Sequence, residues 1–291
     1  MLIVVTNIFL LYSVNGSQTN ISPFMMRNRM FLLLALVGWL TTTTQAQSRR
    51  PAAKPAKTAA IDSVKWRAEH YVVNRDSAYA DPRVALRKLM GGNRRFVENK
   101  SIKPRQDRSA ILSSEKGQKP FATIVGCSDS RVPNEIIFDQ GVGDLFIIRT
   151  AGQVMAAASY GSIEYASVVL GTKLIVVMGH QNCGAVDAAI KRPDVPGHII
   201  SLVNGIKPAA EKTKSMAGDQ LENTIRQNVI DQVNELRDLE PVLAKKYRNG
   251  EILIVGAVYN LGTGKVEFLS ETLQNLPATR AAAEATKPAA K

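Results

Sequence analysis

The sequence predicts an α/β protein in which a mainly parallel central β-sheet is flanked by helices and preceded by an N-terminal helical arm. Short apolar segments with almost no polar interruption predict the strands, at 121–126, 144–148, 173–178 and 251–259. Segments with helical spacing lie between them, at 156–170 and 219–247. Strands without polar alternation are buried on both faces, and strands that alternate with helices are typical of parallel sheets.

Local signals place the remaining elements. Asp81 and Pro82 predict the start of the helical arm, because aspartate caps helix N-termini and proline fits the first helical position. Apolar residues then recur at roughly helical spacing as far as Val97. The segment 219–247 predicts one or two amphipathic helices broken near Pro241, and 266–269 predicts an edge strand.

The chain has an ordinary composition and an uneven charge. Of its 291 residues, 45% are apolar and 21% are charged, which is typical of soluble globular proteins. The formal net charge is +12, but residues 1–60 alone hold six basic residues and no acidic one. The middle of the chain has neither a basic helix nor a stripe of basic and aromatic residues. We therefore expect no nucleic-acid partner.

The sequence divides into four segments. Residues 1–46 read as a signal or targeting segment, since two arginines precede an apolar run at 31–40 and a small-residue cleavage site ends at Ala46. The run is too short for a comfortable membrane span. We expect an exported, periplasmic protein with no membrane attachment after cleavage; an uncleaved anchor is the alternative. A flexible linker at 47–61 and a disordered tail at 278–291 flank one folded domain at 62–277.

Two motifs follow predicted strands directly. The segment 127–131 (CSDSR) follows the first strand, and 180–184 (HQNCG) follows the third. Sites in parallel α/β sheets form at the carboxyl ends of strands, so neighbouring strands would bring the two loops together. The combined set of two thiolates, one imidazole and one carboxylate suits tetrahedral Zn²⁺.

Each of these residues also has a simpler interpretation. Cys127 and Cys183 are the only cysteines, and in an exported protein they could form a disulfide or act as small buried apolar residues. His180 alone would be a structural histidine, and Asp129 with Arg131 a surface ion pair. A disulfide explains neither His180 nor Asp129, which favours the metal site.

Together, CSDSR and the downstream GHQNCG resemble the Cys-x-Asp-x-Arg and His-x-x-Cys motifs of the β-class carbonic anhydrases. The resemblance extends from about residue 81 to residue 269 and implies the β-carbonic anhydrase fold, in a homodimer or homotetramer. It implies that Cys127, His180 and Cys183 hold one Zn²⁺ per subunit. Asp129 and Arg131 match the catalytic dyad of the family, and Asp129 would be a fourth zinc ligand in a closed state.

The activity implied by the resemblance is reversible hydration of CO₂ to bicarbonate and a proton. Zinc-bound hydroxide would attack CO₂, oriented by the Asp129–Arg131 dyad, since zinc acidifies bound water in carbonic anhydrases generally. Two thiolates donate more charge to zinc than two imidazoles would, so we expect the dyad to compensate for a weaker Lewis acid. A noncatalytic zinc-stabilised module and a related CS₂ or COS hydrolase are the alternatives.

The resemblance also implies a substrate pocket. Gln118 lies nine residues before the first cysteine, at the position of a pocket glutamine in plant-type members. The other implied substrate-binding residues are Phe146, Tyr165, Ala151 and Gly184. Bacterial members with a noncatalytic bicarbonate site usually have tryptophan three residues before that cysteine. This sequence has Ile124 there, so we do not expect that form of regulation.

Overall fold

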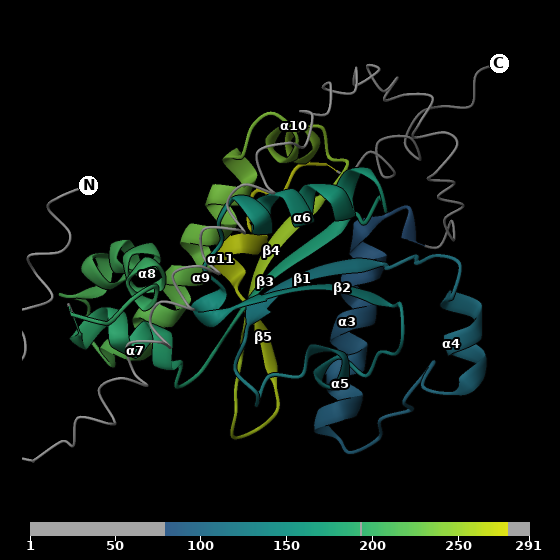
Figure 1. Ribbon diagram of the computed structural model, residues 1–291, viewed down its shortest axis with the longest axis horizontal. Coiled ribbons are helices and arrows are strands. Elements are labelled where there is room, and N and C mark those ends of the chain that lie inside the picture. Colours follow the sequence, from purple (N-terminus) through teal and green to yellow (C-terminus); the bar gives the residue numbers. More distant parts are fainter. Residues whose placement is uncertain (1–78, 193, 279–291) are drawn as a thin grey trace, which may run out of the picture. The chain divides into compact units, whose positions relative to one another are not determined.

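A five-stranded sheet forms the centre of the computed structural model, which describes residues 79–192 and 194–278 (Figure 1). In chain order the strands are β1 (Ala122–Cys127), β2 (Leu145–Thr150), β3 (Leu174–His180), β4 (Leu253–Tyr259) and β5 (Val266–Phe268). Their order across the sheet is β2-β1-β3-β4-β5. The first four strands are parallel and β5 is antiparallel to β4, which confirms the predicted sheet and edge strand.

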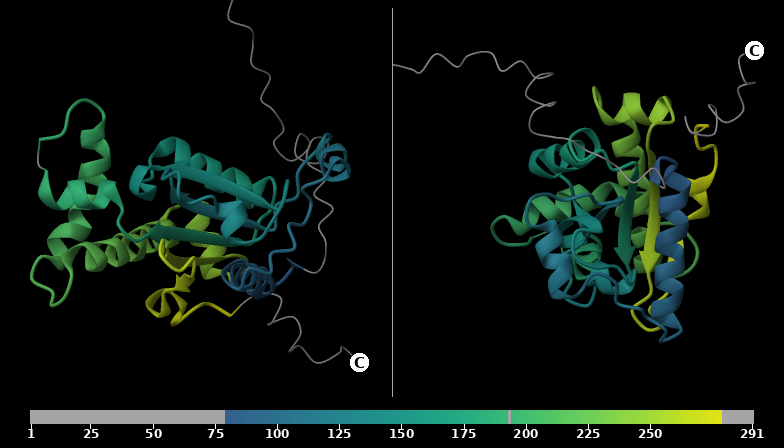
Figure 2. Two further views of the ribbon diagram at one scale, coloured as in Figure 1. Left: turned by 90° about the horizontal axis from the view of Figure 1, so that it is seen from below. Right: turned by 90° about the vertical axis from the view of Figure 1, so that its right-hand side faces the viewer.

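Helices cover both faces of this sheet (Figure 2). They are α3 (Pro82–Val97), α4 (Arg108–Ser114), α5 (Asn134–Ile137), α6 (Ala157–Val168), α7 (Gly184–Lys191), α8 (Ile199–Thr213), α9 (Gln220–Asp238), α10 (Leu243–Arg248) and α11 (Ser270–Leu273), with a 3₁₀ turn η3 (Ala151–Gln153). Side chains of α3 and α5 pack on one face, and those of α6 to α10 pack on the other. Each face therefore has its own apolar core.

Alternate residues of the strands supply the two cores. In β1, Val125 and Cys127 belong to the core beneath α6 to α10, whereas Ile124 belongs to the core beneath α3 and α5. Every residue of β1, β3 and β4 is buried, as the continuous apolar pattern predicts. The alternation directs the Cys127 side chain toward the face covered by α7, α8 and α9.

The predicted helical arm is present and is anchored to the sheet. Asp81 caps α3 by accepting a hydrogen bond from the backbone N–H of Arg83 at 2.9 Å. Further along the helix, buried Asn93 donates to the carbonyls of Ile137 and Gly264, and its side-chain oxygen accepts from the N–H of Val266. This one side chain joins α3, α5 and the start of β5.

The connections of the sheet create a topological switch point between β1 and β3. The chain leaves β1 for β2 on one side, whereas it leaves β3 for β4 on the other side. In open α/β sheets, ligand crevices form beyond the carboxyl ends of two such strands. Cys127 ends β1 and His180 ends β3, so both predicted motifs begin at this point.

The sequence pattern predicts no element between 184 and 213, where the structure has α7 and α8. Gly205 and Pro208 lie inside α8, and both residue types disfavour helices. Packing outweighs that preference, because α8 buries Val203 and Ile206 in the core. The break predicted near Pro241 is confirmed, since α9 ends at Asp238 and α10 begins at Leu243.

Some predictions cannot be compared with the structure. The export signal at 1–46, the linker at 47–61 and the tail beyond residue 278 lie outside the described residues. Within the described ranges, no helix combines the length and apolar character that a membrane crossing requires.

Candidate metal centre

Three potential metal ligands meet at the switch point. Cys127 and His180 end the two central strands, and Cys183 immediately precedes α7. Their ligand atoms all lie within 4.8 Å of one another, and all three residues are buried. The two loops predicted to converge do so, and α7 begins directly after the third ligand.

The two cysteine sulfurs are unpaired and close together. Their Sγ atoms lie 4.0 Å apart, about twice the 2.05 Å length of a disulfide bond. Two sulfurs bound to one tetrahedral zinc at about 2.3 Å each would lie about 3.8 Å apart. The spacing therefore fits a shared zinc ion and differs from the disulfide considered as an alternative.

His180 presents a free ring nitrogen to the two sulfurs. Its Nδ1 lies 2.8 Å from the carbonyl oxygen of Gln181, so Nδ1 carries the proton and donates. Its Nε2 is buried and has no hydrogen-bond partner among the described residues. A buried lone pair without a donor is costly, and coordination to a metal satisfies it.

Negative charge on the two cysteine sulfurs also favours a bound cation. Contact with the Cys183 thiol lowers the pKa of the Cys127 thiol to about 4, with help from His180 and from the amides of Asp129 and Gly152, and against the effect of burial. The nearby Cys127 thiolate in turn raises the pKa of the Cys183 thiol. Burial acts to lower the pKa of His180, but the same thiolate outweighs burial and raises that pKa. A divalent cation between the sulfurs would stabilise both as thiolates.

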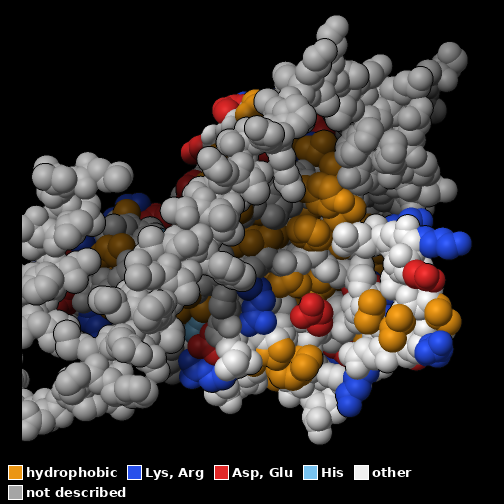
Figure 3. Space-filling view, in the orientation of Figure 1, with side chains coloured by type: hydrophobic (Ala, Val, Ile, Leu, Met, Phe, Trp, Pro, Cys, Tyr) orange, Lys and Arg blue, Asp and Glu red, His pale blue; other side chains and the backbone are white. Residues whose placement is uncertain are grey.

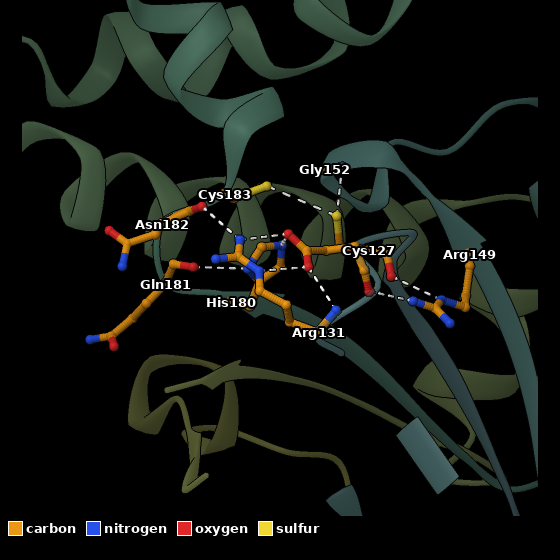
Figure 4. A network of polar contacts seen from close by, with 9 residues as sticks. Cys127, Arg131, Arg149, Gly152, His180, Gln181, Asn182 and Cys183 are labelled. Atoms are coloured by element: carbon orange, nitrogen blue, oxygen red, sulfur yellow. Dashed lines mark hydrogen bonds and ion pairs between the residues drawn. The ribbon is translucent and has the colours of Figure 1, made fainter. Parts of the chain in front are cut away.

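Asp129 forms a tight pair with Arg131, which Figure 4 labels beside the three ligands. The backbone N–H and Nε of Arg131 each donate to Asp129 Oδ1 at 2.9 Å, and its Nη2 donates to Oδ2 at 2.7 Å. The guanidinium holds the pKa of the Asp129 carboxyl well below its usual range. Asp129 Oδ2 is 3.8 Å from His180 Nε2, so the carboxylate faces the ligand cluster.

Arg131 also connects the two loops. Its Nη2 lies 3.5 Å from the carbonyl oxygen of Asn182, the residue before the second cysteine ligand. Asn182 has a left-handed φ of 53°, a conformation that asparagine tolerates better than most residues. One guanidinium thus spans the carboxylate of the first motif and the backbone of the second.

Two further residues hold the first loop, and sequence reasoning missed both. Arg149, near the end of β2, donates through Nε to the carbonyl of Cys127 at 3.0 Å and through Nη2 to the carbonyl of Asp129 at 2.6 Å. The backbone N–H of Gly152 donates to the Cys127 sulfur at 3.3 Å. A charged residue near the end of an apolar strand is a sequence signal that could have identified Arg149. The role of Gly152 can be seen only in the folded turn.

The predicted pocket residues lie in several environments. The rings of Phe146 on β2 and Tyr165 on α6 are neighbours, with centroids 6.2 Å apart, and both are half-buried. Ala151 is half-buried in the turn η3, and Gly184 is exposed at the start of α7. Gln118 is exposed in the loop before β1. The structure brings Phe146 and Tyr165 together near the start of β2, whereas the ligand Cys127 pairs with Thr150 at the end of that strand. The substrate roles of all five residues stay predictions.

Fold and site together define an α/β protein with a buried two-cysteine, one-histidine metal centre at the switch point of its sheet. The family model described as "Carbonic anhydrase" matches residues 122–266. A carbonic anhydrase of Mycolicibacterium smegmatis is 38% identical over 195 residues, which cover 66% of this chain and 95% of the relative. The chain therefore belongs to the carbonic anhydrase family.

Solved structures give the same fold. A β-carbonic anhydrase from Coccomyxa, in complex with acetazolamide, has a TM-score of 0.51 and 26% identity, covering 63% of this chain and 86% of that chain. Two β-carbonic anhydrases of Sordaria macrospora, described as tetrameric, include a chain with a TM-score of 0.51 at 22% identity, covering 64% of this chain and 96% of that chain. The fold that the motif resemblance implied is confirmed.

Proposed function

We propose that this protein catalyses the reversible hydration of CO₂ to bicarbonate and a proton, with zinc as its metal. The observation that carries the proposal is the position of Cys127, His180 and Cys183 within 4.8 Å of one another, beside the Asp129–Arg131 pair. Structural zinc sites in proteins are usually closed by four protein ligands. Here the described residues supply three, as catalytic zinc sites do.

The zinc ion would be held by Cys127 Sγ, Cys183 Sγ and His180 Nε2. When bound, zinc acts as a Lewis acid that lowers the pKa of a coordinated water and so supplies a nucleophile near neutral pH. The protein keeps the imidazole in the required tautomer through the hydrogen bond from Nδ1 to the carbonyl of Gln181. Burial of all three ligands strengthens every electrostatic interaction at the centre.

Asp129 orients the attacking water in this proposal. Its carboxylate accepts a hydrogen bond from that water and so directs a lone pair toward the carbon of CO₂. Arg131 keeps the carboxylate ionised and holds it by three hydrogen bonds. Because both carboxylate oxygens are engaged by Arg131, the structure favours the open state, in which Asp129 is not a fourth ligand.

The substrate would bind between apolar side chains and a few polar groups. CO₂ is apolar, and the half-buried rings of Phe146 and Tyr165 would offer it an apolar wall across a subunit interface, because Phe146 pairs with Thr123, four residues before Cys127 on β1. Ala151 would add to this wall from the chain that holds the metal. Gln118 precedes β1, whose far end carries Cys127, so it would donate to a bicarbonate oxygen from a neighbouring subunit, and the exposed backbone at Gly184 would donate from the chain that holds the metal.

We also propose that the protein works as a homodimer or homotetramer. Helix α6 has a single charged residue, Glu164, and exposes Ala157 and Ala158 beside the edge strand β2. Apolar side chains gather on this part of the surface and over α4, where Ile111 and Leu112 are more than half exposed (Figure 3). Apolar surface of this kind supports contact between copies. The tetrameric Sordaria enzymes share the fold.

Export to the periplasm is a further part of the proposal. It is supported by the charged, apolar and small-residue regions that succeed one another before Ala46. Processing would leave a protein that begins near Gln47 and has no membrane attachment. The intact mass of the protein isolated from the periplasmic fraction would test the cleavage.

Stopped-flow measurement of CO₂ hydration by the purified full-length protein tests the proposed activity. We expect zinc-dependent turnover in the wild type and none above background in Cys183→Ser, which removes one ligand. Asp187→Asn is the matched control: Asp187 lies on α7, four residues after Cys183, and the described partner of its side chain is exposed Lys191. The substitution keeps its backbone N–H, which donates to the carbonyl of Cys183. Zinc-loaded protein that hydrates no CO₂ would identify a noncatalytic module, and turnover of CS₂ or COS instead would identify a related hydrolase.

A further inference from the structure

A chain of hydrogen bonds runs from helix α9 to one of the metal-ligating sulfurs. Gln232 Nε2 donates to Asn228 Oδ1 at 3.1 Å, and Asn228 Nδ2 donates to the carbonyl of Gly152 at 3.1 Å. The backbone N–H of Gly152 then donates to Cys127 Sγ at 3.3 Å, as Figure 4 shows. The three residues that lead to the sulfur are all buried.

The Gly152 turn depends on its surroundings for its shape. Gly152 has a left-handed φ of 64°, and a side chain there would meet Ile206 Cδ1 at 2.6 Å and Ala185 Cβ at 3.1 Å. Glycine is thus the residue that fits, but it is also the residue with the most backbone freedom. A hydrogen bond to its carbonyl restricts that freedom. Among the described residues, the side chain that makes this bond is Asn228.

The N–H to sulfur bond has a chemical consequence at a metal-bound thiolate. A donor that points at the charged form of a group stabilises that charge. The sulfur would then donate less electron density to a bound metal, which would offset part of the Lewis acidity lost by using two thiolates. Outer hydrogen bonds of this kind also fix the direction of the ligand.

We propose that Asn228 is a positioning residue, which holds the Gly152 amide on Cys127 and thereby tunes and steadies the metal-binding sulfur. It touches neither substrate nor metal, and it acts through the turn η3 on the end of β1. The inference rests on the proposed zinc site and adds to it a residue of α9, 101 positions away from the cysteine along the chain.

The test uses the full-length protein with Co²⁺ in place of zinc, since cobalt–thiolate bonds absorb light. In Asn228→Leu and Asn228→Ala the Gly152 turn loses its side-chain partner. The Gly152 N–H is then no longer held on Cys127 Sγ, and the sulfur becomes more electron-rich. We expect the thiolate-to-cobalt charge-transfer band to move to lower energy, and zinc affinity in a chelator competition to fall about tenfold. Gln227→Ala is the control, because Gln227 is the neighbour of Asn228 on α9 and donates to Asp231 instead.

The outcomes separate this inference from the proposed function. Folded Asn228 variants with the wild-type band position and zinc affinity would overturn the positioning role. If the leucine variant does not fold, the alanine variant, which introduces no new bulk, decides the matter. A wild-type protein that binds neither cobalt nor zinc would instead overturn the metal site itself.

Discussion

Arg131 donates hydrogen bonds to both carboxylate oxygens of Asp129, from Nη2 to Oδ2 at 2.7 Å and from Nε to Oδ1 at 2.9 Å. The pair is side-on and bidentate, the geometry in which a guanidinium binds a carboxylate most strongly. It leaves Asp129 ionised and facing the cysteine and histidine ligands, while Arg131 reaches on to the second loop. This arrangement supports the proposed role of Asp129 in orienting the attacking water.

Replacing Asp129 by asparagine should abolish most turnover and leave the metal in place. The amide has the same shape but carries no charge, so it binds Arg131 and the attacking water less strongly. We expect kcat for CO₂ hydration to fall at least about 100-fold, with one zinc still bound per chain. Stopped-flow kinetics and metal analysis of Asp129→Asn check this. Full activity in that variant would reject the role assigned to Asp129.

Activity should rise with pH across the neutral range. Arg131 holds the pKa of the Asp129 carboxyl well below its usual range, so Asp129 is already ionised at mildly acidic pH. It cannot be the group whose deprotonation activates the enzyme near neutrality. We expect kcat to increase between about pH 6 and about pH 9, with an acid limit set by the metal centre. A rate that falls over this interval would contradict the mechanism.

Phe146→Ala should lower kcat/KM for CO₂ hydration without releasing zinc. The substitution removes the Phe146 ring, whose centroid lies 6.2 Å from that of the Tyr165 ring. Loss of apolar contact in a small pocket costs about tenfold in kcat/KM. Kinetics at several CO₂ concentrations, with the zinc content measured in parallel, check the effect. An unchanged kcat/KM would place the substrate elsewhere.

Asp139→Ala should destabilise the fold away from the metal. The Asp139 carboxylate is buried and accepts hydrogen bonds from Arg95 Nε and from the N–H groups of Ile102 and Lys103. Removing it leaves two backbone N–H groups and the Arg95 guanidinium, which is about a third exposed, without their acceptor, and we expect the unfolding free energy to fall by about 2 kcal/mol. Urea unfolding measures the loss. Lys100→Ala, in an exposed pair with Glu98, is the control and should change stability by less than about 1 kcal/mol.

The contribution of Asp139 should also depend on pH. Although burial opposes it, Arg95 and the two amides lower the pKa of the Asp139 carboxyl in the folded protein. A group with a lowered folded pKa stabilises the protein above its unfolded pKa of about 3.9, and that stability is lost as the pH falls further. The difference between wild type and Asp139→Ala should therefore shrink in acid. A difference that grows below about pH 4 would contradict the assignment.

Continuous apolar strands and their spacing were enough to predict the sheet, because burial on both faces leaves a pattern that local sequence carries. The metal ligands were predictable for a similar reason. Cys127 and His180 each end a buried strand, and a parallel sheet gathers the carboxyl ends of its strands at one edge.

Features that depend on packing between distant segments left little trace in the sequence. Helix α8 forms despite Gly205 and Pro208, because its apolar face is buried. The bond from Gly152 to the Cys127 sulfur lies in a left-handed turn that faces Ile206 and accepts a hydrogen bond from Asn228, residues on other elements. No local pattern identifies such a contact before the chain is folded.

The most direct test of the account is X-ray absorption at the zinc edge of the purified full-length protein. We predict one zinc per chain, bound by two sulfurs at about 2.3 Å and by one imidazole nitrogen and one further light atom at about 2.0 to 2.1 Å. Cys183→Ser should reduce the sulfur count to one or release the metal. A protein that is folded and free of metal, with its two sulfurs joined in a disulfide, would contradict the account.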